Sequence, residues 1–329
     1  MRCGASFCYR GNAEGVFEVT LTNGIYPNTL GMRNKTVFGR IDMSVYDDIK
    51  KKFVLPDAYD DWKEYRELLT DKIIGLRKGN PEKTVCVIGA GRCNDIDKHK
   101  LLDAFANVSL VDYDTDAVGG VFKGLTNKEI WKLYIREMSL TGITEKDIAA
   151  FCEETLLFLR KCGNDLMADD FYRITYSGLE KLKNRMIKSG EEILKILPKS
   201  DIVLCNGVFS QLFSTISFFI KSCAASMPER LIPEAMKAAS KLEEQLALIS
   251  RDIVPVITGA IIRSANEYAV FGNEYSEEHP VEGACRCIDA VRNEKVVEES
   301  RHIWDFNRKR NIRYEMLIQI VETGKNVVF

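Results

Sequence analysis

From residue 84 onward, short apolar runs alternate with longer stretches in which apolar residues recur at helical spacing. We predict strands over Thr84–Ile88, 108–111, about 136–140, 200–206 and 251–262, with helices between them. Strands separated by helical stretches are typical of a parallel sheet with helices on both faces. Right-handed crossovers would then place the carboxyl ends of all these strands at one edge, where such folds bind ligands.

The C-terminus carries two further strand patterns, HIWDF and IRYEMLIQIVE. We expect them to form a final pair, with at least one strand antiparallel to the rest. The predicted fold class is therefore α/β: a doubly wound, mostly parallel, seven-stranded Rossmann-like sheet with an antiparallel C-terminal strand.

The first fifty residues differ from the remainder, because they alternate with a period of two around a hairpin signal at Asn23-Gly24. We expect a β-rich arm over 1–50 and one larger domain over 51–329. That domain contains a helical insertion at about 143–199, carried by DIAAFCEETLLFLRKC and GLEKLKNRMIKSGEEILKIL. The insertion is either a lid at the ligand edge or extra helices that thicken the domain.

The composition makes several classes of partner unlikely. Forty-six basic and 48 acidic residues give a net charge of −2, which makes nucleic acid an unlikely partner. No secretory signal is visible and the apolar runs are too short to span a bilayer, so we expect a cytoplasmic protein without a membrane partner. The ten cysteines are expected to be reduced, and Cys285 and Cys287 with His279 lack the ligand spacing of a zinc site. We predict no metal, and a homodimer stays open.

The chemistry concentrates in VCVIGAGRCNDIDKHK, residues 85–100, where a predicted strand runs into Gly89-Ala90-Gly91 and then a helix. Glycines let the backbone approach a ligand closely, and free N–H groups at a helix start favour polar or anionic groups. Asp112 ends the next strand, 23 residues past Gly89, where a carboxylate can accept both hydroxyls of a ribose. The two features predict a ribose-containing cofactor, with a purely structural turn as the alternative.

The acids after the turn favour one cofactor over another. A dinucleotide fingerprint places glycine at its sixth position, but Asn94 stands there, followed by Asp95 and Asp97. Two carboxylates beside a pyrophosphate are electrostatically unfavourable. S-adenosylmethionine carries a sulfonium, an ammonium and a ribose but no phosphate, so we predict it in preference to NAD.

VCVIGAGRCND, LVDYD and SDIVLCNGVFSQLF, in this order, resemble motifs of class I S-adenosylmethionine-dependent methyltransferases, over roughly residues 60 to 329. The larger domain over 51–329 is then a class I methyltransferase-like domain, similar to bacterial members of the superfamily. The resemblance implies a cofactor site in which the glycine loop lies against the methionine part, Asp112 binds the ribose and Tyr113 lies beside the adenine. It implies the cofactor-binding residues Gly89, Ala90, Gly91, Asn94, Asp95, Asp112, Tyr113, Leu140, Thr141, Cys205, Asn206 and Gly207.

The resemblance departs from the family at the third strand, where Ser139 stands in place of the acid that accepts from the adenine amino group. It implies a small-molecule or peptide substrate, because the tetrad typical of amino-methylating enzymes is replaced by Cys205-Asn206-Gly207-Val208. His279 is a weak candidate for a catalytic base, since histidine titrates near neutrality. Two alternatives stay open: an NAD-dependent oxidoreductase, and a methyltransferase-fold protein that binds without catalysis.

Overall fold

The seven-stranded sheet has the order β5-β4-β3-β6-β7-β9-β8. The computed structural model describes residues 8–11, 17–20, 45–114, 119–165 and 167–324. β3 to β7 run parallel, and β9 is antiparallel to both β7 and β8. This arrangement confirms the predicted fold class. The strands are β3 Thr84–Ile88, β4 Asn107–Asp112, β5 Leu133–Glu137, β6 Ser200–Asn206, β7 Ala265–Tyr275, β8 Val296–Asn307 and β9 Ile312–Glu322.

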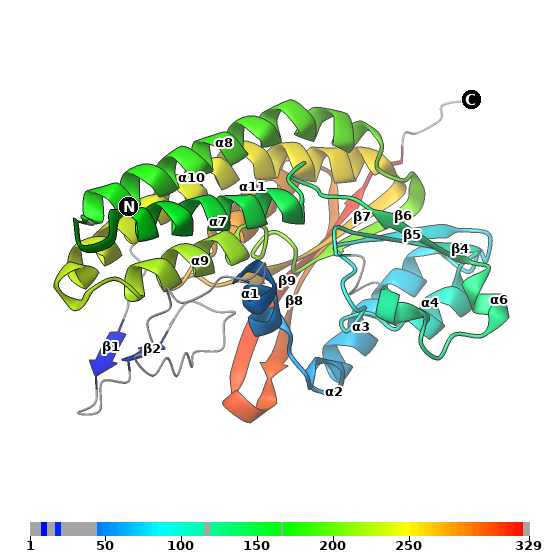
Figure 1. Ribbon diagram of the computed structural model, residues 1–329. Coiled ribbons are helices and arrows are strands. Elements are labelled where there is room, and N and C mark those ends of the chain that lie inside the picture. The colour runs from blue at the N-terminus through cyan, green and yellow to red at the C-terminus, as the bar shows by residue number, and fades with distance from the viewer. Residues whose placement is uncertain (1–7, 12–16, 21–44, 115–118, 166, 325–329) are drawn as a thin grey trace.

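Helices cover both faces of the sheet (Figure 1). One face carries α3 and α4 and the other carries α10 and α11, while α7, α8 and α9 pack with α10 and α1 in a separate helical core. The helices are α1 Val45–Phe53, α2 Ala58–Asp61, α3 Lys63–Leu76, α4 Lys98–Ala104, α6 Asn127–Ile130, α7 Glu145–Cys162, α8 Ala168–Lys195, α9 Ser214–Ala225, α10 Ile232–Ser264 and α11 Glu282–Val291.

The predicted fifth strand over 251–262 is wrong, because this segment is the last part of helix α10. Val254, Ile257, Thr258 and Ile261 are buried, which is helical spacing along one face. A short run of β-branched residues is compatible with either a strand or a buried helix. Here the run continues a long helix and is helical. Within the seven-stranded sheet, the fifth strand in chain order is β7, ANEYAVFGNEY, which follows directly.

The predicted third strand is displaced toward the C-terminus. β5 ends at Glu137, which pairs with Asp112 in register, and the Met138 N–H donates to the Asp112 carbonyl at 2.9 Å before the chain leaves the strand. The first two and last two predicted strands lie where expected, at β3, β4, β8 and β9.

The N-terminal arm is described only at β1 (Cys8–Gly11) and β2 (Phe17–Thr20), which pair antiparallel; Asn23-Gly24 lies outside the described residues. The predicted insertion contains α7 and α8. Within the described ranges, one helical segment, Glu229–Ser264, is long and apolar enough to cross a membrane by length and composition, and 44% of its most apolar window is buried inside the fold. The domain boundaries and the cytoplasmic location stay predictions.

Candidate cofactor and acceptor site

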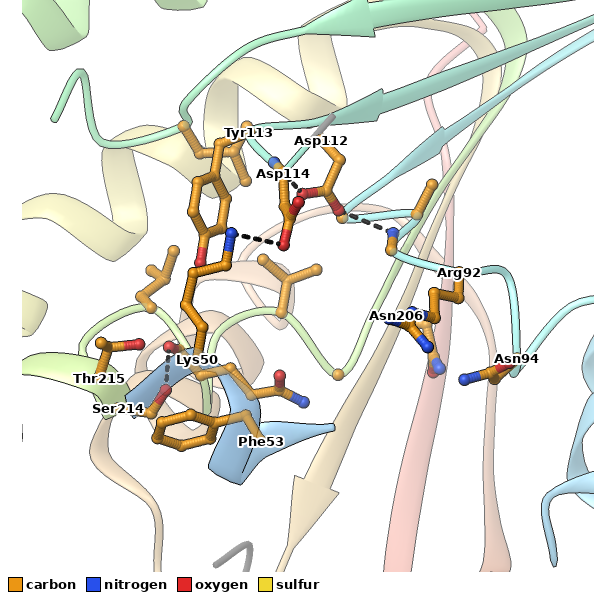
Figure 2. Close-up of a pocket in the computed structure, with 18 of the residues that line it drawn as sticks. Lys50, Phe53, Arg92, Asn94, Asp112, Tyr113, Asp114, Asn206, Ser214 and Thr215 are labelled. Atoms are coloured by element: carbon orange, nitrogen blue, oxygen red, sulfur yellow. Dashed lines mark hydrogen bonds and ion pairs between the residues drawn. The ribbon is translucent and has the colours of Figure 1, made fainter. Parts of the chain in front are cut away.

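A pocket of about 710 Å³ opens at the carboxyl ends of β3, β4 and β6 (Figure 2). Ligand pockets for small molecules have volumes of a few hundred to about a thousand Å³. Eleven of the twelve residues predicted to bind a cofactor line it, drawn from four separate segments. They are Gly89, Ala90, Gly91, Asn94, Asp95, Asp112, Tyr113, Leu140, Thr141, Asn206 and Gly207.

The glycine loop has the backbone that only glycine adopts without strain. Gly89 and Gly91 have φ of +70° and +47°. A Cβ atom on Gly89 would lie 2.2 Å from Cγ2 of Val208. The β3–α4 loop therefore touches the β6–α9 loop directly, and a side chain at Gly89 would separate the two loops.

Asp112 holds this loop from the neighbouring strand. Its Oδ2 accepts from the Gly91 N–H at 2.7 Å, and its Oδ1 accepts from the Asp114 N–H at 2.9 Å. Burial raises the pKa of the Asp112 carboxyl, and these N–H groups act in the opposite direction. A carboxylate has about four acceptor positions, so each oxygen keeps capacity for one hydroxyl of a ligand.

Asn206, at the end of β6, links helix α3 to the β3–α4 loop. Its Oδ1 accepts from the Tyr65 hydroxyl at 2.7 Å, and its Nδ2 donates to Asp95 Oδ2 at 2.6 Å. Because Tyr65 donates to the amide oxygen, the amide nitrogen faces Asp95 and favours its ionised form. Burial nevertheless raises the pKa of Asp95. A Cβ atom on Gly272 would lie 1.9 Å from Asn206 Oδ1, so this arrangement requires glycine on β7.

The start of helix α4 is already occupied by a carboxylate of the chain itself. Asp97 is the N-cap residue, and its Oδ1 accepts from the N–H groups of His99 and Lys100 at 3.0 and 3.1 Å. In dinucleotide-binding folds these N–H groups receive the pyrophosphate. Here they have a partner, and a second negative group would meet the charge of Asp97.

Helix α1 closes one side of the pocket, although the sequence placed residues up to 50 in the β-rich arm. Lys50 contacts Asp114 at 3.1 Å and Glu145 at 2.5 Å, so it joins α1 to the segment after β4 and to α7. Figure 2 shows its side chain extending past Tyr113 toward Asp114. No motif in the sequence marks Lys50, because both its partners are distant along the chain.

Aromatic side chains from α2–α3 and β8 form the far wall of the pocket. Trp62, Trp304 and Phe306 all line it. Trp62 packs edge to face on Trp304 at 4.6 Å and donates its indole N–H to the Phe306 carbonyl at 2.9 Å. Sequence periodicity identifies such residues as apolar, but it does not separate a core tryptophan from one that lines a pocket.

Two predicted site residues lie elsewhere. Cys205 is buried in the core on the other face of the sheet, because neighbouring strand residues point to opposite faces and Asn206 points into the pocket. His279 is an exposed residue of the loop after β7 and does not line the pocket. Ser139 does line it, and its Oγ lies 3.2 Å from Oγ1 of Thr141. In the described ranges, no group of three or more His, Cys, Asp or Glu side chains is placed to hold a metal ion.

Comparison with known proteins gives similarity in fold only. No protein-family model matches the chain, and no curated protein does. Among solved structures, the N-methyltransferase NodS from Bradyrhizobium japonicum WM9 with bound S-adenosylhomocysteine is 9% identical, with a TM-score of 0.43, covering 85% of this chain and 98% of that one. Magnesium protoporphyrin IX methyltransferase from Synechocystis PCC 6803 is 10% identical, with a TM-score of 0.39, covering 86% and 99%. A methyltransferase from Aquifex aeolicus is 10% identical, with a TM-score of 0.36, covering 86% and 100%.

Proposed function

We propose that this chain is an S-adenosylmethionine-dependent methyltransferase that acts on a small molecule. The observation that carries the proposal is the chemistry around the glycine loop. Asp112 and Asp95 offer carboxylate oxygens there, while the start of α4 is capped by Asp97. Such a corner suits a ribose and an ammonium and disfavours a pyrophosphate.

The described residues fit this cofactor. Asp112 would accept the ribose hydroxyls and Asp95 the ammonium of the methionine part, with Gly89 to Gly91 against its backbone. Tyr113 would lie against the adenine, with Leu140 and Thr141 on its other side. When bound, the cofactor supplies a methyl group activated by the sulfonium.

The chain itself contributes alignment and a dry site. Methyl transfer needs the acceptor in line with the bond that breaks, and holding both reactants in place lowers the barrier. Asn206 is fixed from two sides and stands at the junction between the glycine loop and the aromatic wall. Helix α1 and the aromatic wall would exclude water from the reacting groups. The pocket volume suits a cofactor together with a small acceptor, and this favours a small molecule over a peptide.

Calorimetric titration with S-adenosylmethionine, S-adenosylhomocysteine and NAD tests the proposal. We expect both adenosyl compounds to bind and NAD not to bind. Asp112→Asn should weaken S-adenosylhomocysteine binding at least tenfold, whereas Asp103→Asn, an exposed change on α4, should not alter it. Binding of NAD alone would support the oxidoreductase alternative instead. Binding of the adenosyl compounds without methylated products in a cell extract would support the non-catalytic alternative.

A further inference from the structure

The two ends of the pocket differ in charge. The described charged lining residues are Lys50, Lys51, Arg92, Asp95, Asp112 and Asp114, and they come from the glycine loop, the end of β4 with the segment after it, and one turn of α1. Lys50 is paired with Asp114, which neutralises two of them. The other end, beyond Asn206, is lined by apolar or uncharged side chains in the described residues. They include Leu55, Trp62, Val208, Gln211, Trp304 and Phe306.

Trp62 is the partly exposed ring of the aromatic wall at this uncharged end, whereas Trp304 and Phe306 are only 2% and 4% exposed and pack against it. Trp304 stacks on Tyr65 at 5.2 Å with an interplanar angle of 21°, and Trp62 stacks on Phe306 at 5.5 Å with 27°. The indole of Trp62 is further held by its hydrogen bond to Phe306. Trp62 is therefore fixed by the two buried rings, so the part of its surface that faces the pocket is preformed. A preformed aromatic surface favours flat, apolar partners that stack or pack edge to face.

A charged acceptor has no compensation at this end. Burying a charge without a partner is costly, and no side chain of the described wall supplies an opposite charge. Gln211, which lies with Trp304 beside Gly207, is neutral and suits a single hydrogen bond to a hydroxyl or a ring nitrogen.

We propose that the uncharged end of the pocket selects a flat, uncharged aromatic methyl acceptor, seated between Leu55 of the α1–α2 segment and Trp62, which Trp304 and Phe306 hold in place. This substrate class rests on the proposed methyltransferase function. It adds a requirement that the function alone does not impose, namely discrimination against cationic and anionic acceptors of the same shape.

The tryptophans give a direct readout. The chain has three, and Trp131 is 83% exposed and does not line the pocket. Indole N–H signals of ¹⁵N-labelled protein, with Trp131 assigned by Trp131→Phe, therefore report the wall and one internal reference. With S-adenosylhomocysteine present, 2-naphthol, 2-naphthoate and 2-naphthylmethylammonium are titrated in turn. We expect 2-naphthol to shift the signals of Trp62 and Trp304 but not that of Trp131, and to bind at least tenfold more tightly than either ion.

Leu55→Glu tests the same inference from the side of the protein. It should weaken 2-naphthol binding about tenfold, while S-adenosylhomocysteine binding stays within twofold. Val297→Glu, the same kind of change at an exposed position of β8 outside the pocket, should alter neither. Equal or tighter binding of either naphthyl ion overturns the inference, as does binding of S-adenosylhomocysteine with no response to any naphthyl probe. Failure of S-adenosylhomocysteine to bind instead overturns the proposed function.

Discussion

Asn206 depends on a glycine 66 residues away in the sequence. Gly272 lies opposite Asn206 in the pairing of β6 with β7 and leaves the room that the amide occupies. With alanine at 272, either the amide turns away from Tyr65 and Asp95, or the two strands separate. Both outcomes disturb the side of the site that would hold the methionine part of the cofactor.

We therefore predict that Gly272→Ala weakens S-adenosylhomocysteine binding at least tenfold and lowers the melting temperature. Calorimetry and thermal unfolding measure the two effects. Gly75→Ala is the matched control, because a Cβ atom there meets nothing within 4 Å and alanine favours the helix. Unchanged binding in Gly272→Ala would show that the position of Asn206 does not matter for the cofactor.

Glu274, two residues further along β7, gives a pH dependence. It is buried, and burial raises the pKa of its carboxyl to about 8, against an opposing hydrogen bond with Ser210. In the unfolded chain a glutamate titrates near ~4.3. Between these values the folded state holds a proton that the unfolded state has released, so the free energy of unfolding falls as pH rises through this window.

The melting temperature of the parent should accordingly fall between pH 5 and pH 8 more steeply than that of Glu274→Gln, which carries no proton to lose. Thermal unfolding at several pH values measures the difference, and the exposed Glu294→Gln should follow the parent. Parallel curves for the parent and Glu274→Gln would show that the glutamate does not hold its proton in the folded state.

At the level of single residues, the sequence predicted polar atoms at strand ends well and side-chain direction poorly. The strand-end positions of Asp112 and Asn206 follow from hydrophobic runs that stop at a polar residue. Cys205 was placed in the site because it is adjacent to Asn206, but the pleat turns it away. Helical spacing places Tyr65 on an apolar helix face, but neither its bond to Asn206 nor the buried position of Glu274 was predicted, because both come from packing between elements distant in the sequence.

Among the elements, helix α1 reaches the site through a single turn that carries Lys50, Lys51 and Phe53. Lys50 joins α1 to the rest of the fold through ion pairs with Asp114 and Glu145. Burial alone would lower the pKa of its ammonium, but these two carboxylates together raise it. Removing the charge leaves two carboxylates without their shared partner beside the pocket. The loss of these ion pairs would destabilise the segment that follows Asp112.

Lys50→Met should therefore weaken S-adenosylhomocysteine binding several-fold and speed its dissociation, as measured by calorimetry and stopped-flow displacement. Lys181→Met removes an ion pair with Glu154 on the exposed face of α8 and should leave both quantities unchanged. Equal behaviour of the two variants would mean that α1 is held in place without Lys50.

Helices and strands were predicted correctly where the apolar residues fit a single pattern. The prediction failed at the end of α10, where they fit both a strand and a helix. The buried strands β3, β4 and β6 are short apolar runs bounded by turns or polar residues. The end of α10 is also a short apolar run with β-branched residues, and Pro255 adds a signal against a helix. The segment continues the preceding helical turns, and its buried residues pack against the sheet and α11.

For the whole molecule, cofactor binding and stability should be linked. The pocket draws on α1, α2, the loops after β3, β4, β5 and β6, and strand β8, so a ligand that bridges them binds the folded chain alone. At a concentration one hundred times its dissociation constant, such a ligand adds about 2.7 kcal/mol to the free energy of unfolding. S-adenosylhomocysteine should raise the melting temperature by several degrees, and NAD at the same concentration should leave it unchanged.

The topology of the whole sheet was predictable because alternating strands and helices leave few arrangements. The composition of the pocket was only half predictable. Its proposed cofactor end follows the strand ends and their motifs. Its aromatic end combines Trp62, which precedes the first strand of this sheet in the sequence, with Trp304 and Phe306 on β8. No local pattern connects residues that are more than two hundred positions apart.

The place of β8 in the sheet has a consequence for synthesis of the protein. Among the described strands, β8 pairs with β9 alone, and β9 joins the sheet through β7, so Trp304 and Phe306 can reach the pocket only after β7, β8 and β9 have been synthesised. A nascent chain that has emerged through β6 already contains the glycine loop, Asp112 and Asn206. Such an intermediate has the elements of the proposed cofactor end before the aromatic wall is in place, so the proposed acceptor site is completed only later.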